Sequence, residues 1–161
     1  MSRLALAGLV VLLALGAGCR RASKAEGATG RELSVQVPAA LQVARGLDTL
    51  SVQLDPDLLA RRTVRVEPGW TVGLSYRARV FEQGQTRVES ERHGDLPGRG
   101  FKLGTLQWRT GRDGLPRPGN KYLVEMKLVL FETDVPPGPH WNPHSGHFKP
   151  LFSRTLRQAE E

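Results

Sequence analysis

Two stretches in which apolar and polar residues alternate set the limits on this fold. From Trp70 to Val80 every second residue is apolar, and the residues between them are Thr, Gly, Ser and Arg. The stretch from Tyr122 to Phe131 alternates in the same way but also carries apolar residues on its second face. A period of two places neighbouring side chains on opposite faces of a β-strand. The pattern predicts two long strands, of which the second is central in its sheet because both its faces need cover.

Shorter alternations and turn residues occupy most of the remaining chain. The mostly polar strand expected near residues 86–92 suits a sheet edge, and Pro150 suits an edge or a bulge in the last strand. Residues Asp55 to Ala60 are expected to form one helical turn. We predict an all-β fold, an Ig-like or transthyretin-like β-sandwich of about seven or eight antiparallel strands. The shorter strands are expected near residues 33–37, 50–54, 63–66, 86–92 (the polar one), 101–108 and 148–157.

The N-terminal segment has the organisation of an export signal. Arg3 precedes an unbroken apolar run from Leu4 to Leu15, and Gly16-Ala17-Gly18 lead into Cys19, the single cysteine. This arrangement resembles a bacterial lipoprotein signal peptide, and the resemblance implies cleavage after Gly18 and lipidation of Cys19. The apolar run is too short for a membrane-spanning helix, which needs about 20 residues. A cleaved, soluble export product is the alternative.

These features predict the organisation of the whole chain. Residues 1–18 form the signal peptide, 19–31 the lipidated cysteine and a flexible polar tether, 32–158 one β-sandwich domain, and 159–161 a tail. A lipid anchor implies attachment to a membrane of the cell envelope. Because Arg20 replaces the aspartate of an inner-membrane retention signal, the outer membrane is the favoured location.

The charge balance narrows the class of partner. Without residues 1–18 the chain keeps 22 Lys and Arg against 16 acidic residues, which gives about +6. The basic residues are scattered without a run, which is typical of a solvated surface; a lipid- or polysaccharide-binding patch is the alternative. Export to the envelope makes nucleic acid an unexpected partner.

The segment from Asp134 to His147 is long for a loop in a small β domain. Its prolines lower the entropy cost of fixing it, and with its aromatic neighbours it has the content of a recognition surface. The alternative is a loop that packs back over an open end of the sandwich. The candidate partner-binding residues are Pro136, Pro137, Trp141 and Phe148.

Three of the four histidines also fall in or beside this loop, at His140, His144 and His147. Three imidazoles can bind zinc or copper, with water or Asp134 completing the coordination and His93 as a further ligand. The competing interpretation is a set of exposed loop histidines. We therefore expect no cofactor, with a zinc or copper site as the alternative.

Catalytic motifs are not evident. Glu89 and Glu91 could form an acid and base pair, but alternation of Glu and Arg is ordinary on a polar edge strand. The runs Gly69 to Tyr76, Glu82 to Gly84 and Phe101 to Gly104 resemble parts of FKBP-type prolyl isomerases. That resemblance implies that Tyr76 would line a proline pocket.

The leading hypothesis from the sequence is a non-catalytic envelope lipoprotein. Its tethered β-sandwich would bind a protein partner in a multi-protein machine for secretion, motility or surface export. A metal- or small-ligand-binding lipoprotein that uses the histidine loop is the second hypothesis, and a degenerate prolyl isomerase is the third.

Overall fold

The computed structural model describes residues 29–161, and the predicted signal peptide, Cys19 and most of the tether lie outside this range. No helix within the described range is long and apolar enough to cross a membrane. The elements are β1 (Arg31–Pro38), β2 (Leu41–Arg45), β3 (Thr49–Leu54), β4 (Leu59–Val66), β5 (Thr71–Glu82), β6 (Val88–Pro97), β7 (Leu106–Arg109), α1 (Thr110–Asp113), β8 (Tyr122–Thr133), the short helix η1 (Pro143–Ser145) and β9 (Phe148–Ala159).

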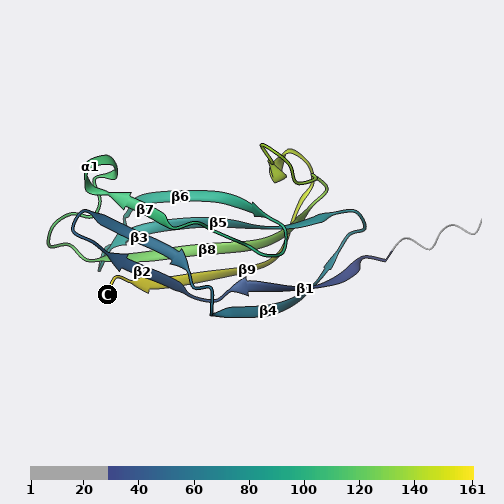
Figure 1. Ribbon diagram of the computed structural model, residues 1–161, viewed down its shortest axis with the longest axis horizontal. Helices are drawn as coiled ribbons and strands as arrows, with labels where there is room; N and C mark the ends of the chain where they lie inside the picture. The colour runs from purple at the N-terminus through teal and green to yellow at the C-terminus, as the bar shows by residue number, and fades with distance from the viewer. Residues whose placement is uncertain (1–28) are drawn as a thin grey trace, which may run out of the picture.

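The strands form three antiparallel sheets, which confirms the predicted all-β sandwich. The largest sheet has the order β6-β5-β8-β9, a second has the order β2-β3-β7, and β1 pairs with β4. Figure 1 shows the four long strands running side by side, with β2, β3 and β7 toward the left end of this sheet and β1 and β4 below β9 in this view. As predicted, β8 is central, and β6 and β9 are the edges of the largest sheet.

One hydrophobic core joins the three sheets. The inner face of the largest sheet contributes alternate residues of β5 and β8, and Trp108 of β7 is fully buried against them. Trp108 also donates a 2.8 Å hydrogen bond from Nε1 to Ser90 Oγ, which satisfies its only polar atom. The smaller sheets supply Leu33, Val35, Val37, Leu41, Val43, Leu50, Val52 and Val66.

Three predicted elements differ from the structure. Strand β2 (Leu41–Arg45) was not predicted because it is short, and it pairs with β3. The expected helical turn from Asp55 to Ala60 is absent from the described structure: Asp55 caps a turn by accepting from Asp57 N at 2.9 Å, and Leu59 already pairs with Pro38 in the β1·β4 sheet. The strand expected near 101–108 is confined to Leu106–Arg109, where β3 supplies partners.

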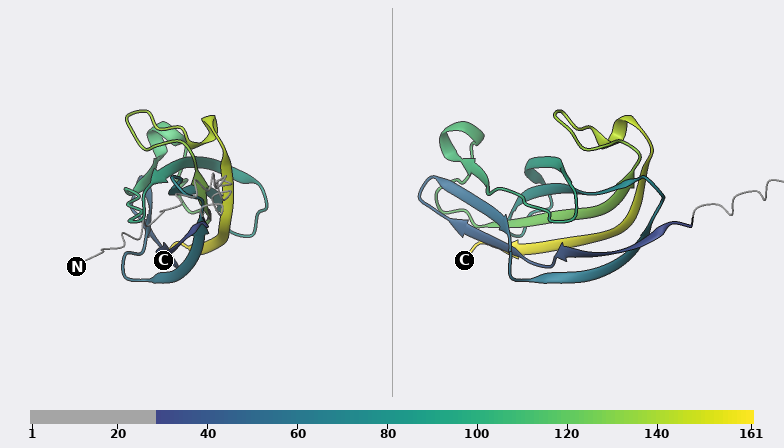
Figure 2. Two further views of the ribbon diagram at one scale, coloured as in Figure 1. Left: turned by 90° about the vertical axis from the view of Figure 1, so that its right-hand side faces the viewer. Right: turned by 45° about the vertical axis from the view of Figure 1, so that its right-hand side comes forward.

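The bulge suggested by Pro150 is present. Leu130 pairs with Phe152 and Phe131 pairs with Pro150, so that Leu151 is an extra residue in β9. A bulge bends its strand and increases the local twist. The right-hand view of Figure 2 shows β8 and β9 bending at this end of the sheet, toward the loop that joins them.

A buried carboxylate closes the same end of the core. Glu132 is fully buried, and its Oε2 accepts a 2.7 Å hydrogen bond from Glu67 N. Lys149 Nζ lies 3.0 Å from Glu132 Oε1 and forms an ion pair with it. Contact with this carboxylate raises the pKa of Lys149. Lys149 therefore supplies the counter-charge that a buried carboxylate requires.

Replacing Lys149 by methionine should lower the free energy of unfolding and the midpoint of denaturant unfolding, because the buried Glu132 loses its counter-charge. Denaturant unfolding measures the change. Adding Glu132→Gln should recover part of the loss, since a neutral amide needs no cation. The control Lys121→Met removes an exposed lysine elsewhere and should change stability by less than about 0.5 kcal/mol. Equal effects of the two lysine variants would contradict the assignment.

Candidate functional site

The candidate site lies on the outer face of the four-stranded sheet, where the loop 134–147 between β8 and β9 folds back over it. The central residue is Phe131, which points away from the core yet is fully buried. Its ring stacks on Trp141 at 5.8 Å and on Phe148 at 4.4 Å between centroids. His144 then stacks on Phe148 at 4.4 Å. The base of the loop therefore packs back on the outer face of the sheet.

Gly73 makes room for this aromatic cluster. It is buried in β5 directly opposite Phe131 of β8. A Cβ atom at this position would lie 2.7 Å from the Trp141 ring and would also collide with the Phe131 ring. Real Cβ atoms do not approach other atoms so closely, so the glycine is needed for its lack of a side chain.

Hydrogen bonds fix the remainder of the loop. Trp141 Nε1 donates to Val135 O at 3.1 Å, and the buried Thr133 hydroxyl donates to Pro143 O at 3.1 Å. His147 bonds Asp134 twice, through its backbone N at 2.8 Å and through Nδ1 at 2.7 Å. The His147 ring also stacks on Trp70 at 5.9 Å. The base of the loop is therefore attached to β5, β8 and β9.

The tip of the loop remains exposed. Pro136, Pro137 and His140 all face solvent, whereas Trp141 and Phe148 are half-buried in the cluster. His140 has a φ of 59°, which is rare for a residue with a side chain and marks a sharp turn. The predicted partner-binding residues thus divide into two that anchor the loop and two that it presents.

Two of the three loop histidines contact different carboxylates, and the third is exposed. His144 Nε2 lies 3.4 Å from Asp95 Oδ2, His147 is paired with Asp134, and His140 is exposed at the turn. Within residues 29–161 no group of three or more His, Cys, Asp and Glu residues is arranged to hold a metal ion. Zinc or copper binding stays a prediction that would need the loop to rearrange.

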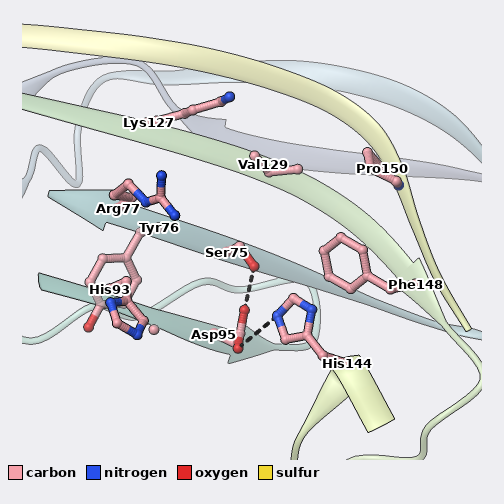
Figure 3. Close-up of a pocket in the computed structure, with 11 residues that line it drawn as sticks. Ser75, Tyr76, Arg77, His93, Asp95, Lys127, Val129, His144, Phe148 and Pro150 are labelled. Carbon is pink, nitrogen blue, oxygen red and sulfur yellow. Dashed lines mark hydrogen bonds and ion pairs between the residues drawn. The ribbon is translucent and has the colours of Figure 1, made fainter. Parts of the chain in front are cut away.

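A pocket of about 360 Å³ lies between the loop and the open part of the sheet. Figure 3 shows side chains from β5, β6, β8, β9 and η1 around it, with Asp95 between Ser75 and His144. Asp95 accepts from Ser75 with one oxygen and faces His144 with the other. The lining residues are Ser75, Tyr76, Arg77, His93, Gly94, Asp95, Lys127, Val129, His144, Phe148 and Pro150.

The other chemical candidates from the sequence have structural partners. Glu89 Oε2 lies 3.0 Å from Arg117, and Glu91 Oε2 lies 2.9 Å from Arg79. Each of the two carboxylates thus has an arginine partner on the surface. Tyr76 packs across Gly94, where a Cβ would lie 2.8 Å from its hydroxyl, and the tyrosine also lines the pocket.

The sequence did not identify Gly73, Asp95, Arg77 or Lys127 as site residues. The alternation in β5 and β8 does place Arg77 and Lys127 opposite the main apolar face of each strand. Their meeting across β5 and β8 depends on the pairing register, which no local pattern gives.

Comparison of the chain with protein-family models, with curated proteins and with solved structures gives no match. The site is therefore interpreted from its own geometry.

Substituting Gly73 by alanine should destabilise the protein by about 1 to 3 kcal/mol and release Trp141 from Phe131, because the added methyl overpacks the cluster. Trp fluorescence and limited proteolysis within 134–147 measure the release. Gly138→Ala is the matched control in the same loop, since a Cβ there meets nothing within 4 Å. Proteolysis as slow as in the wild-type protein would contradict this role of Gly73.

The Asp134 and His147 pair should make the loop sensitive to acid. Hydrogen bonds from the His147 side chain and backbone hold the pKa of Asp134 below its ordinary value of 3.8. A lowered folded-state pKa contributes stability above pH 3.8 that is lost as the pH falls through the folded pKa. An NMR titration of the Asp134 carboxyl carbon should therefore give a midpoint below 3.8, and His147→Ala should move it upward. An unchanged midpoint in the variant would disprove the coupling.

Proposed function

We propose that this protein is a lipid-anchored envelope protein whose β-sandwich is a non-catalytic binding component of a multi-protein assembly for secretion, motility or surface export. Cys19 would carry the lipid, and the outer membrane is the favoured location. The loop 134–147 would contact the protein partner. The lipoprotein-like segment 1–19 of the sequence supports the anchor.

The observation that carries the binding role is an exposed proline-rich tip on a fixed base. Trp141 and Pro143 are held by the sheet, while Pro136 and Pro137 remain accessible. Prolines have no freedom in φ to lose on binding, and a fixed base removes most of the ordering cost of the loop. Such a segment can form an interface with little loss of conformational entropy.

The position of the loop fits attachment from the N-terminus. β1 begins at Arg31, on the side of the molecule that also holds the loop, and the C-terminus lies at the opposite end (Figure 1). Thr29 and Arg31 border a hollow with Trp70, whose ring stacks on His147. A tether that leaves from this end would keep the loop on the side of the domain nearer the membrane, where membrane-bound partners are accessible.

Affinity purification of a C-terminally tagged full chain from solubilised envelopes tests the proposal. The wild-type protein should recover a partner in constant proportion, and the double variant Pro136→Ser/Pro137→Ser should recover about tenfold less, as expected for loss of an interface contact. The matched control is Pro56→Ser/Pro118→Ser, which changes two exposed prolines elsewhere. Cys19→Ala should remove the protein from the membrane fraction.

The outcomes distinguish the proposed partner-binding role of the loop from its alternatives. Equal recovery of the partner by the loop variant and the control would place the interface elsewhere on the domain. Recovery of the wild-type protein alone would contradict the assembly role. Stoichiometric zinc or copper binding by the purified protein, lost in His144→Ala, would instead support a metal-binding function for the loop.

A further inference from the structure

A row of basic residues crosses the outer face of the largest sheet beside the pocket. His93 of β6 pairs with Arg77 of β5, and Arg77 pairs with Lys127 of β8. Residues paired directly across antiparallel strands have adjacent side chains, and like charges in that position are destabilising. Arg77 and Lys127 therefore form an unfavourable pair that the fold maintains.

In the next row of paired residues along the sheet, neighbouring charges have opposite signs. There Glu91, Arg79, Glu125 and Arg157 succeed one another across the four strands. Arg79 lies 2.9 Å from Glu91, and Arg157 lies 2.6 Å from Glu125. Signs alternate along this row and each charge has a partner of opposite sign, in contrast to the adjacent Arg77 and Lys127.

The two basic side chains nearest the pocket have little neutralisation. Within residues 29–161 Lys127 has no ion pair, and Arg77 approaches only Glu91, at 3.6 Å. That carboxylate is already closer to Arg79, at 2.9 Å. Among the described residues Asp95 is the one acidic residue that lines the pocket, and its two oxygens contact Ser75 and His144. The pocket thus has positive charge available for a ligand.

Apolar side chains line another part of the pocket, beside the group formed by Ser75, Asp95 and His144. Figure 3 shows Arg77, Lys127 and His93 on one side, and Phe148 and Pro150 on the other, with Val129 between them. Phe148 cannot move freely because it stacks on Phe131 and His144. A volume of about 360 Å³ is near the lower end of ligand sites, which suits a short molecule.

From this arrangement we infer that the pocket binds a small organic acid. Its carboxylate lies between Arg77 and Lys127, and its short apolar body covers Val129 against Phe148 and Pro150. Inorganic phosphate would satisfy only the basic side, and a neutral hydrocarbon only the apolar side. The guanidinium of Arg77 and the ammonium of Lys127 can both donate charge-assisted hydrogen bonds to the same carboxylate. The site does not depend on the partner interface proposed above.

Titration of the purified full chain in a non-ionic detergent tests the inference, with hexanoate as the probe and calorimetry or NMR shifts as the readout. Hexanoate should bind more tightly than acetate, 1-hexanol and inorganic phosphate by about tenfold each, because only hexanoate uses both sides of the pocket. Amide shifts should be confined to the elements that line the pocket, which are β5, β6, β8, η1 and the start of β9.

Two variants and a matched control test the residues. Lys127→Gln and Arg77→Gln should each weaken hexanoate binding by about tenfold while leaving 1-hexanol binding unchanged. Both side chains are exposed, so circular dichroism should show an intact fold. Lys121→Gln removes an exposed lysine before β8 and should leave hexanoate binding unchanged.

The inference is overturned by several results. Equal binding of hexanoate and 1-hexanol would show that the basic residues do not contribute to binding the carboxylate. Equal binding of phosphate and hexanoate would show that the site binds anions without selecting for an apolar body. Similar losses in Lys121→Gln would indicate a general charge effect. Absence of hexanoate binding in the wild-type protein would remove the site altogether, without affecting the proposed interface.

Discussion

Strand β8 carries apolar residues on both faces, and covering them organises the rest of the molecule. Its inner face, from Tyr122 to Leu130, is fully or almost fully buried beneath the smaller sheets. Its outer face carries Phe131, which no second sheet formed by residues 29–161 covers. Exposed aromatic surface at this position would cost burial free energy and promote association. The loop 134–147 supplies the missing cover, with Trp141 and Phe148 against the Phe131 ring.

The pocket is a consequence of this incomplete second layer. Because the loop covers only the end of the sheet, the surface beside it stays open between η1 and the row of Arg77 and Lys127. The aromatic cluster that closes one side is the same cluster that fixes the loop. A single set of contacts therefore gives the protein both a presented proline tip and a rigid apolar wall.

Several acidic residues of the domain are neutralised by a neighbouring basic residue. At the end of the core, Lys149 neutralises the buried Glu132, and on the outer sheet Arg79 and Arg157 neutralise Glu91 and Glu125. Neutralised pairs of this kind cost little and hold adjacent strands in register. Against that pattern the basic row beside the pocket stands out as an exception, and exceptions to local consistency are where binding sites are found.

The sequence by itself determined the all-β class, the central place of β8 and the edge strands, because alternation and turn residues are local properties of the chain. It also indicated the bulge near Pro150, since proline cannot donate to a sheet. Only the tertiary structure decided that the loop packs back, that Gly73 admits Trp141, and which partners His144 and His147 take. Those contacts join residues far apart in the chain, and their formation depends on strand register and on the bend of β8 and β9, which follow from packing of the whole domain and from no single segment.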